Sequence, residues 1–522
     1  MNPNFWTRML CAALLFSLAL STSLAQEKET KPAEKSSEAA PAPPPKEESS
    51  VTEHSIKIGG QTVPYKATAG TIFLKNEKDE NEALIYYTAY TRSDVKDLSQ
   101  RPLAFLYNGG PGSSSIWLHM GSFGPKRVVT VNADITPPAP YKLEDNPDCL
   151  LDRTDLVFID PVGTGFSKAV GKAQDKDFWG VDQDARSLAQ FVQSYVTRNN
   201  RWNSPKFLIG ESYGTFRNAA LANLLQSRNG IYLNGIVMVS SVWDLGTLSF
   251  YPGVDLAYIL YLPSYAATAW YHKVLKDHPD NLPAFLDEAR KFAKTEYADA
   301  LLKGDTLSAA ERSAIAKKLE HFTGLSEDYI LKSNLRVKLR AFMQELQRNR
   351  GLTTGRLDAR FSGPTYDLIA AGADYDPQST AITGAFTAAF NMYVREDLKF
   401  GHDRDYHVSA HFGDNHWDWK HETGGPGPSF FPGTPNVMRD LANAIITNPK
   451  LQVEMEDGYY DLATPFLEAE YATEHLGLPE NLQKNIHHKY YEAGHMMYLR
   501  TEDLAKLKAN VAAFIDSTSK TQ

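Results

Sequence analysis

Short apolar runs recur along the first half of the chain, and the first three end in glycine-rich loops. They are Leu103–Tyr107, Leu156–Ile159, Phe207–Ile209 and Gly235–Val239. Unbroken apolar runs of this length are typical of strands buried on both faces of a parallel sheet. Between the second and third runs, residues 181–195 carry apolar side chains at helical spacing. Strands that alternate with helices predict an α/β fold with a mostly parallel central sheet, in which ligands bind at the carboxyl ends of the strands.

The chain on either side of these runs predicts other structures. Upstream, Thr71–Leu74 and Ala83–Tyr90 flank a polar stretch, which predicts a β-hairpin. Downstream, from about residue 251 to residue 391, helical patterns dominate. The longest are Leu282–Leu302, Ala309–Phe322 and Leu335–Arg348.

The last part of the chain returns to the α/β pattern, with a strand predicted at Leu451–Met455 and a helix at Glu502–Ile515. The predicted division is therefore a core over 51–250, a largely helical cap inserted over 251–440, and the rest of the core over 441–522.

The first fifty residues predict an export signal and a tether. Arg8, the apolar run Leu10–Leu20 and the small residues at 23–25 are typical of a signal peptide over 1–25. Residues 26–50 alternate Lys, Glu, Ser, Ala and Pro, which predicts a disordered linker. We therefore expect an exported protein, periplasmic or secreted, with no membrane span after signal cleavage. An uncleaved anchor stays open as the alternative, although the run is short for a span.

Composition limits the partners. Of 522 residues, 42% are hydrophobic and 22% charged, which is typical of a soluble globular protein with a sizeable core. The net charge of −9, with no long basic run, argues against nucleic acid as a partner. The two cysteines are Cys11, inside the predicted signal, and Cys149, which we expect to be a packed thiol. No intramolecular disulfide is then expected, and the oligomeric state stays unknown.

The strongest chemical signal is the pentapeptide Gly210–Gly214, of sequence GESYG. It follows a predicted strand and precedes a helical stretch at 218–225. A G-x-S-x-G turn in this context holds its serine on a sharp bend where a base can reach the hydroxyl. Ser212 is therefore the candidate nucleophile.

A serine hydroxyl needs a base, and the base needs an acid to orient it. On this type of sheet they follow the serine in the order acid, then histidine. Asp461 lies just after the predicted strand at 451–455, and His495 lies on a loop before the last helix. Both are candidates for these roles, and the alternative for each is a solvated loop residue. His487 and His488 are weaker candidates, because nothing around them indicates a loop above the sheet.

A second glycine-rich loop, Asn108–Gly112, also follows a predicted strand. Backbone N–H groups exposed by glycine can stabilise the oxyanion of a tetrahedral intermediate. The loop is not a phosphate loop, because no Lys follows its glycines.

Five stretches in this order resemble the serine carboxypeptidase family (peptidase family S10), which has the α/β-hydrolase fold, and an exported bacterial member in particular. Asn108–Ser115 is similar to N-G-G-P-G-C-S-S with Ser113 for Cys, Asp160–Ser167 to D-x-P-V-G-x-G-F-S with Asp160 shifted by one residue, Gly210–Gly214 to G-E-S-Y-G, Asp461–Pro465 to D-x-x-x-P, and Ala493–Met496 to A-G-H-M.

The resemblance implies a role for each of these residues. Ser212 would be the nucleophile, His495 the base and Asp461 its partner. The oxyanion hole would consist of the N–H groups of Gly110 and Tyr213. Asn108 and Glu211 would bind the terminal carboxylate of a peptide substrate. Glu211 can donate a hydrogen bond to a carboxylate only when it is protonated, which requires a raised pKa.

The chain departs from the family pattern at Ser122, where an E-x-G-P stretch usually supplies a second Glu that pairs with the first. Without it, Glu211 has one reason fewer to be protonated. We therefore expect a pH optimum less acidic than is usual for the family, and weaker discrimination for a free C-terminus. A further departure is Met497-Tyr498, which replaces the V-P that follows A-G-H-M.

Five histidines gather between residues 402 and 421, with Asp414 and Asp418 nearby. They are His402, His407, His411, His416 and His421. A metal site, a substrate-facing loop and an ordinary polar loop are the alternatives, and the spacings match no compact zinc signature. We expect an ordinary polar loop, and neither metal nor cofactor.

The leading hypothesis is an exopeptidase that releases C-terminal residues through an acyl-enzyme on Ser212. An esterase or acyltransferase with the same Ser-His-Asp triad is the alternative. A catalytically silent binding protein is the third, and it is disfavoured because all three triad positions are filled.

Overall fold

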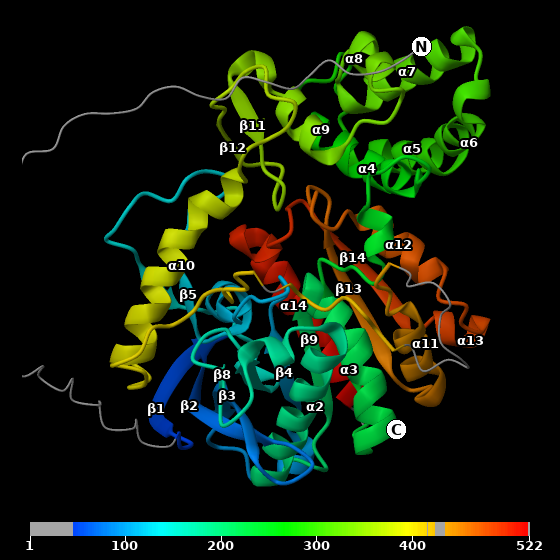
Figure 1. Cartoon of the computed structure of the whole chain (residues 1–522). Helices are drawn as coiled ribbons and strands as arrows, with labels where there is room; N and C mark the ends of the chain where they lie inside the picture. Colours follow the sequence, from blue (N-terminus) through cyan, green and yellow to red (C-terminus); the bar gives the residue numbers. More distant parts are fainter. Residues whose placement is uncertain (1–44, 415, 423–433, 520–522) are drawn as a thin grey trace, which may run out of the picture. The chain divides into compact units, whose positions relative to one another are not determined.

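A ten-stranded sheet forms the centre of the computed structural model, which describes residues 45–414, 416–422 and 434–519 (Figure 1). Its strands are β1 (Ser49–Ile58), β2 (Gln61–Lys75), β3 (Asn81–Arg92), β4 (Leu103–Tyr107), β7 (Asp155–Ile159), β8 (Lys168–Ala169), β9 (Lys206–Glu211), β10 (Gly235–Val239), β13 (Gln452–Gly458) and β14 (Ile486–Tyr491). Two small two-stranded sheets pair β5 (Lys126–Val128) with β6 (Leu143–Asp145) and β11 (Leu352–Thr354) with β12 (Ser362–Pro364).

The strand order is β1-β2-β3-β7-β4-β9-β10-β13-β14, with β8 paired to β3. The strands from β7 to β14 are parallel to one another, and β1, β2 and β3 pair antiparallel at the other edge. The predicted hairpin is β2–β3, and all five predicted strands are present. The predicted α/β-hydrolase fold with a mostly parallel sheet is confirmed.

The parallel strands are buried on both faces, which explains their unbroken apolar runs. Leu106 and Phe158 belong to the hydrophobic core on one face, with the terminal helix α14 (Thr501–Ser519). Phe105 and Val157 belong to the core on the other face, which α2 (Val181–Arg198) and α3 (Tyr213–Asn229) cover. Figure 1 shows α2 and α3 in front of the sheet and α14 behind it.

The remaining helices come mostly from the region between β10 and β13. Those over residues 256–345 form a third hydrophobic core together with Tyr460, Leu462, Phe466 and Leu467, whereas the helix over 377–396 joins the first core and the helix over 438–447 joins the second. The remaining helices are α4 (Leu256–Tyr271), α5 (Leu282–Phe292), α6 (Ala298–Lys303), α7 (Ala309–Thr323), α8 (Glu327–Lys332), α9 (Leu339–Glu345), α10 (Pro377–Glu396), α11 (Met438–Thr447), α12 (Phe466–Glu474) and α13 (Glu480–Gln483), while α1 (Ile116–Leu118) precedes them. The division into core and cap at residues 251 and 440 stays a prediction.

The helix predicted at 335–348 is shorter than expected, because α9 spans only Leu339–Glu345. Asn334 and Leu335 have φ angles of 54° and 64°. Two successive residues in the left-handed region cannot continue a right-handed helix, so the chain turns here before α9 begins.

Most of the first fifty residues, including the predicted signal, lie outside the described residues. The end of the predicted linker is ordered, which the sequence did not predict. Glu47 Oε1 accepts a hydrogen bond from Phe73 N at 2.8 Å and its other oxygen pairs with Arg198 at 2.7 Å, and β1 begins at Ser49. No helix among the described residues is both long and apolar enough to cross a bilayer.

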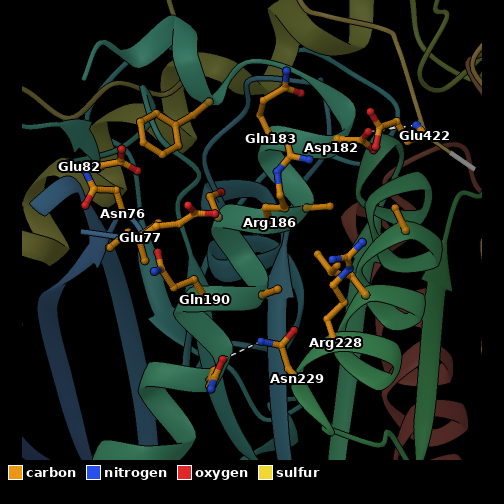
Figure 2. A pocket seen from close by; sticks show the side chains of 18 of the residues that line it. Asn76, Glu77, Glu82, Asp182, Gln183, Arg186, Gln190, Arg228, Asn229 and Glu422 are labelled. Atoms are coloured by element: carbon orange, nitrogen blue, oxygen red, sulfur yellow. Dashed lines mark hydrogen bonds between the residues drawn. The ribbon is translucent and has the colours of Figure 1, made fainter. Parts of the chain in front are cut away.

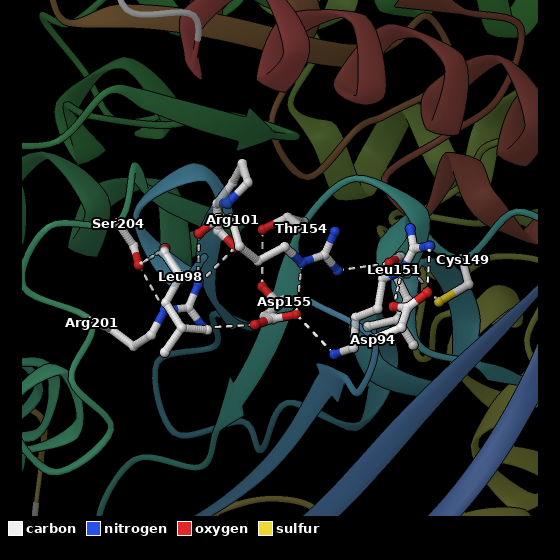
Figure 3. Close-up of polar contacts among 11 residues, drawn as sticks. Asp94, Leu98, Arg101, Cys149, Leu151, Thr154, Asp155, Arg201 and Ser204 are labelled. Atoms are coloured by element: carbon white, nitrogen blue, oxygen red, sulfur yellow. Dashed lines mark hydrogen bonds and ion pairs between the residues drawn. The ribbon is translucent and has the colours of Figure 1, made fainter. Parts of the chain in front are cut away.

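A buried ionic cluster ties together the amino ends of β4, β7 and β9 (Figure 3). Asp155 pairs with Arg101 at 2.9 Å and with Arg201 at 2.6 Å, and all three side chains are buried. The Arg101 Nη2 atom also donates to Leu151 O at 2.7 Å. Nearby Cys149 is buried as expected, and burial raises the pKa of its thiol to about 12.

The Asp155→Asn variant is expected to lower the free energy of unfolding by about 3–5 kcal/mol, because it leaves two buried guanidinium groups without a counter-charge. Urea unfolding of the variant and of the wild type would measure the change. Asp94→Asn is the matched control: Asp94 pairs with Arg92 at 2.6 Å, but the pair is solvent-accessible, so it should have a much smaller effect. Equal midpoints for Asp155→Asn and wild type would contradict this account.

Candidate active site

Ser212 lies on a strained turn between the carboxyl end of β9 and the first residue of α3. Its φ and ψ angles are 59° and −128°, a conformation that non-glycine residues adopt only when the surroundings impose it. Glycine is required at 210, because a Cβ there would lie 2.3 Å from Gly214 O, and a Cβ on Gly214 would lie 3.0 Å from Tyr107 O. Ser212 itself is partly exposed, whereas its neighbours Glu211 and Tyr213 are buried.

Asp461 follows β13 and is fully buried, with hydrogen bonds to both carboxylate oxygens. Its Oδ1 accepts from the backbone N–H groups of Ala463 at 2.7 Å and Thr464 at 3.0 Å. Its Oδ2 accepts from Thr464 Oγ1 at 2.8 Å and from His495 Nδ1 at 2.7 Å. These bonds hold the carboxylate in one orientation toward the histidine.

His495 and Ser212 are anchored to adjacent residues at the carboxyl end of β10. Ser212 N donates to Val239 O at 2.9 Å, and Ser240 Oγ donates to His495 O at 2.7 Å. His495 N also donates to Leu357 O at 2.6 Å. His495 is thus in contact with Asp461, and it is anchored one residue from the anchor of Ser212 at the carboxyl edge of the sheet, where ligands are expected in such folds.

The loop Asn108–Gly112 packs directly onto the serine turn. A Cβ on Gly109 would lie 2.4 Å from Tyr213 N and 2.7 Å from Glu211 O, so no side chain fits at this position. Gly110 follows with a φ of 109°. Tyr213 is the first residue of α3, and the N–H of a first helical residue has no partner within its own helix. The loop and the helix end thus lie side by side next to Ser212.

Asn108 and Glu211 are buried and in contact. Asn108 Nδ2 donates to Glu211 Oε1 at 2.8 Å, and Asn108 Oδ1 accepts from Leu118 N at 3.0 Å. The Asn108 carbonyl oxygen accepts from Arg217 Nη1 at 2.7 Å. Glu211 precedes the nucleophile, so this pair lies beside the reacting centre.

The pKa values of two groups in the site, Glu211 and His495, are raised above their usual values. Burial raises the pKa of Glu211 to about 7, although His495 and the hydrogen bonds from Tyr498 and Asn108 favour its ionised form. Burial acts to lower the pKa of His495, but the charge and the hydrogen bond of Asp461 raise it above its usual value, and Glu211 adds to this rise. Shifted values of this kind are typical of active sites.

A sequence model of the family described as serine carboxypeptidase matches residues 59–295. This range contains both the loop at 108–112 and the serine turn at 210–214, and the acid and the histidine follow in the expected order. Over this part of its length the chain is similar to serine carboxypeptidases.

Curated relatives match part of the chain. Serine carboxypeptidase-like 45 of Arabidopsis thaliana is 28% identical over 210 residues, which cover 38% of this chain and 42% of that protein. Pheromone-processing carboxypeptidase KEX1 of Saccharomyces cerevisiae is 30% identical over 161 residues, which cover 30% of this chain and 21% of that protein. The matches thus span less than half the length of these relatives.

A solved structure extends the similarity of the fold. The crystal structure of KEX1(delta)p, a prohormone-processing carboxypeptidase from Saccharomyces cerevisiae, covers 87% of this chain and 92% of its own, with a TM-score of 0.55 and 16% identity. At this identity the similarity concerns the fold alone.

Ser122, at the position where the family motif has Glu, does not hydrogen-bond to Glu211, because its hydroxyl bonds elsewhere. It lies in a π-helical turn, His119–Phe123, and its hydroxyl donates to Leu118 O at 2.7 Å. The partner of Glu211 is instead Tyr498, whose hydroxyl lies 2.6 Å from Glu211 Oε2. The sequence did not predict this contact. The only related signal was that Met497-Tyr498 replaces the V-P of the family motif.

Other residues that position the site were also missed. Arg217, fully buried on α3, donates to Asp184 Oδ2 of α2 at 2.6 Å as well as to the Asn108 carbonyl. Thr464 and Ser240 hold Asp461 and His495 as described above. Each is a common polar residue in a helix or loop, and no short motif sets it apart.

The histidine-rich segment at 402–421 is attached to the core by His421. Its two ring nitrogens lie 2.6 Å from Asp182 Oδ1 and 2.7 Å from Asp440 Oδ2. Burial acts to lower the pKa of His421, but hydrogen bonds to the two carboxylates raise it to about 9. Within the described ranges, no group of three or more His, Cys, Asp or Glu side chains is arranged to hold a metal ion.

A separate depression of about 950 Å³ lies along α2 and α3 and beside the loop that joins β2 and β3 (Figure 2). Gln183, Arg186 and Gln190 of α2 and Arg228 of α3 line it. None of the seven predicted site residues lines it, so it is distinct from the triad.

Proposed function

We propose that the protein is a serine carboxypeptidase that releases C-terminal residues from peptides through an acyl-enzyme on Ser212. The observation that carries the proposal is the strained turn at Ser212, anchored beside a His495 that Asp461 holds at 2.7 Å. A nucleophile, a base and an orienting acid in this arrangement suit acyl transfer. The family match supports the same activity.

In the proposed reaction, His495 Nε2 takes the proton of Ser212 Oγ as this oxygen attacks the carbonyl carbon of the last peptide bond. The resulting oxyanion accepts hydrogen bonds from the N–H groups of Gly110 and Tyr213, beside Ser212. The C–N bond then breaks, and His495 returns the proton to the leaving amine. In the second step His495 takes a proton from water as its oxygen attacks the ester carbon. The bond from this carbon to Ser212 Oγ then breaks, His495 gives the proton to Oγ, and the shortened peptide leaves with a new C-terminal carboxyl group.

Recognition of the C-terminus is proposed for Asn108 and Glu211. An ionised Glu211 would repel a carboxylate, whereas a protonated Glu211 can donate an O–H to it. Because burial raises the pKa of Glu211 to about 7, the acid form is available up to neutral pH without a second carboxyl group hydrogen-bonded to it.

These two groups predict the pH dependence. The kcat/KM value for a free-acid substrate is expected to rise with pH as His495 loses its proton, and to fall above about pH 7 as Glu211 ionises. The optimum should therefore lie near pH 7. For the corresponding C-terminal amide, which carries no charge, the fall above pH 7 should be absent. A free-acid optimum below about pH 5, close to the ordinary pKa of Glu, would contradict this account.

The proposed activity is tested with one N-blocked dipeptide and its amide between pH 4 and pH 9, together with labelling by a fluorophosphonate probe. Cleavage of the free acid, with labelling at Ser212, is expected. Labelling at Ser212 without cleavage of the free acid would favour an esterase or acyltransferase. Failure to label would contradict an active serine nucleophile altogether.

Export to the periplasm or the medium is also proposed, on the basis of Arg8, the apolar run Leu10–Leu20 and the small residues at 23–25. The helical region between β10 and β13 is proposed as a cap that shapes the pocket for the terminal side chain.

A further inference from the structure

The contact between Tyr498 and Glu211 joins two buried groups that can both carry a proton. Tyr498 is 1% exposed and Glu211 is 2% exposed. Their oxygens lie 2.6 Å apart, and Asn108 Nδ2 occupies the other carboxylate oxygen at 2.8 Å. Because both Glu211 oxygens have a hydrogen-bond partner within the protein, the proton count of the pair decides what it can offer a ligand.

The count has two cases. With Glu211 ionised, the pair has one O–H hydrogen, that of Tyr498, and the bond to Glu211 uses it. With Glu211 protonated, the pair has two O–H hydrogens, the bond between the two groups uses one, and the other is free for an acceptor. The pair therefore offers an incoming anion one donor in its protonated state and none in its ionised state.

The backbone turn at Tyr498 and the packing of its ring position this side chain. It lies in a 3₁₀ turn, Met497–Leu499, two residues beyond the A-G-H-M stretch. A Cβ on Gly121 would lie 2.5 Å from Tyr498 Cε2, so the ring packs against a position where no side chain fits. The ring thus packs against Gly121 while its hydroxyl bonds to the carboxyl group of Glu211.

We propose that Tyr498 is a third residue of the site that recognises the terminal carboxylate of the substrate, where it positions Glu211 and sets the pH above which the site stops accepting a free acid. This inference rests on the proposed carboxypeptidase activity. The ligand class is a peptide with a free C-terminal carboxylate, and the terminal amide serves as its uncharged counterpart.

The other groups that face Glu211 are His495 and Asp461, from the loops after β14 and β13, and Asn108 from the loop after β4. Those that face Tyr498 are Glu211 and Asn108. Glu211 has two side-chain hydrogen-bond partners, Asn108 and Tyr498. The hydroxyl of Tyr498 can be removed without changing the charge of the site or any residue of the triad. A hydrogen bond to the ionised form of a carboxyl group lowers its pKa.

The test is the Tyr498→Phe variant of the full chain, assayed with the N-blocked dipeptide and its amide from pH 5 to pH 10. Loss of the hydroxyl should raise the pKa of Glu211, so the fall of kcat/KM for the free acid should move to higher pH by about one to two units, the size expected for a hydrogen bond to a charged group. The shift should lie in KM and not in kcat, and the amide profile should not change.

Tyr491→Phe is the matched control. Tyr491 is also fully buried and donates to a buried glutamate, Glu456 Oε2, at 2.6 Å, but neither belongs to the site. It should leave the free-acid profile unmoved. In a Glu211→Gln background, adding Tyr498→Phe should produce no shift, because the titrating group is gone.

If Tyr498→Phe does not fold, 3-fluorotyrosine at position 498 replaces it, since this analogue keeps the hydroxyl and makes it more acidic. It should move the fall to lower pH. Folded variants whose free-acid profile matches that of the wild type would overturn the role of Tyr498 alone. A wild type that cleaves no free acid would overturn the proposed activity, and the role of Tyr498 with it.

Discussion

Replacing Ser212 with alanine should lower kcat for the free-acid dipeptide by about 10⁶-fold and abolish labelling by the fluorophosphonate probe. The reason is that Ser212 Oγ is the only protein atom proposed to bond the substrate carbon. The strained φ of 59° is imposed by Gly210, Gly214 and the bond from Ser212 N to Val239 O, and alanine retains all of them. The fold should therefore be unchanged.

Single-turnover and steady-state rates of the purified variant would measure this loss, and thermal unfolding would check the fold. Ser227→Ala is the matched control, because Ser227 lies on the same helix α3, is exposed and bonds only to Asn223 O. It should retain full activity. Residual activity above about one-thousandth of the wild type in Ser212→Ala would argue for another nucleophile.

Replacing Asp461 with asparagine is expected to lower kcat by about 10⁴-fold, although the side chain keeps its size. The structure gives the reason. Oδ1 accepts from the N–H groups of Ala463 and Thr464, so the oxygen of asparagine must take this position. The amide nitrogen then faces His495 Nδ1 and donates to it, which puts the ring proton on Nε2. In that tautomer His495 cannot take the proton of Ser212.

The rate loss of Asp461→Asn would be measured between pH 6 and pH 9 with the same dipeptide. Thr464→Val is the informative comparison: it removes one donor to Asp461 Oδ2, at 2.8 Å, but retains the charge, so its effect should be far smaller. Asp94→Asn makes the same chemical change at the surface and should leave kcat unchanged. A loss of less than tenfold in Asp461→Asn would show that the carboxylate does not control the tautomer.

The residues of the triad could be predicted because their local sequence is constrained. The serine turn requires glycine at 210, since a Cβ there would lie 2.3 Å from Gly214 O, and it favours glycine at 214, where a Cβ would lie 3.0 Å from Tyr107 O. This leaves a pattern within five residues. Buried strands leave a similar trace as apolar runs. By contrast, β14 reads IHHKYY, lies at the edge of the sheet and is only partly buried. It left no such run, so His487 and His488 were not predicted to lie on a strand.

The sequence by itself determined which residues form the fully buried strands, the serine turn and the glycine-rich loop, because each depends on neighbours within a few positions along the chain. Only the tertiary structure decided the state of Glu211 and its partner. Tyr498 lies 287 positions away from it, and burial, which raises the pKa of Glu211, results from the packing of the whole core. Contacts of this kind depend on how strands and loops distant in sequence are brought together, and no local pattern encodes them.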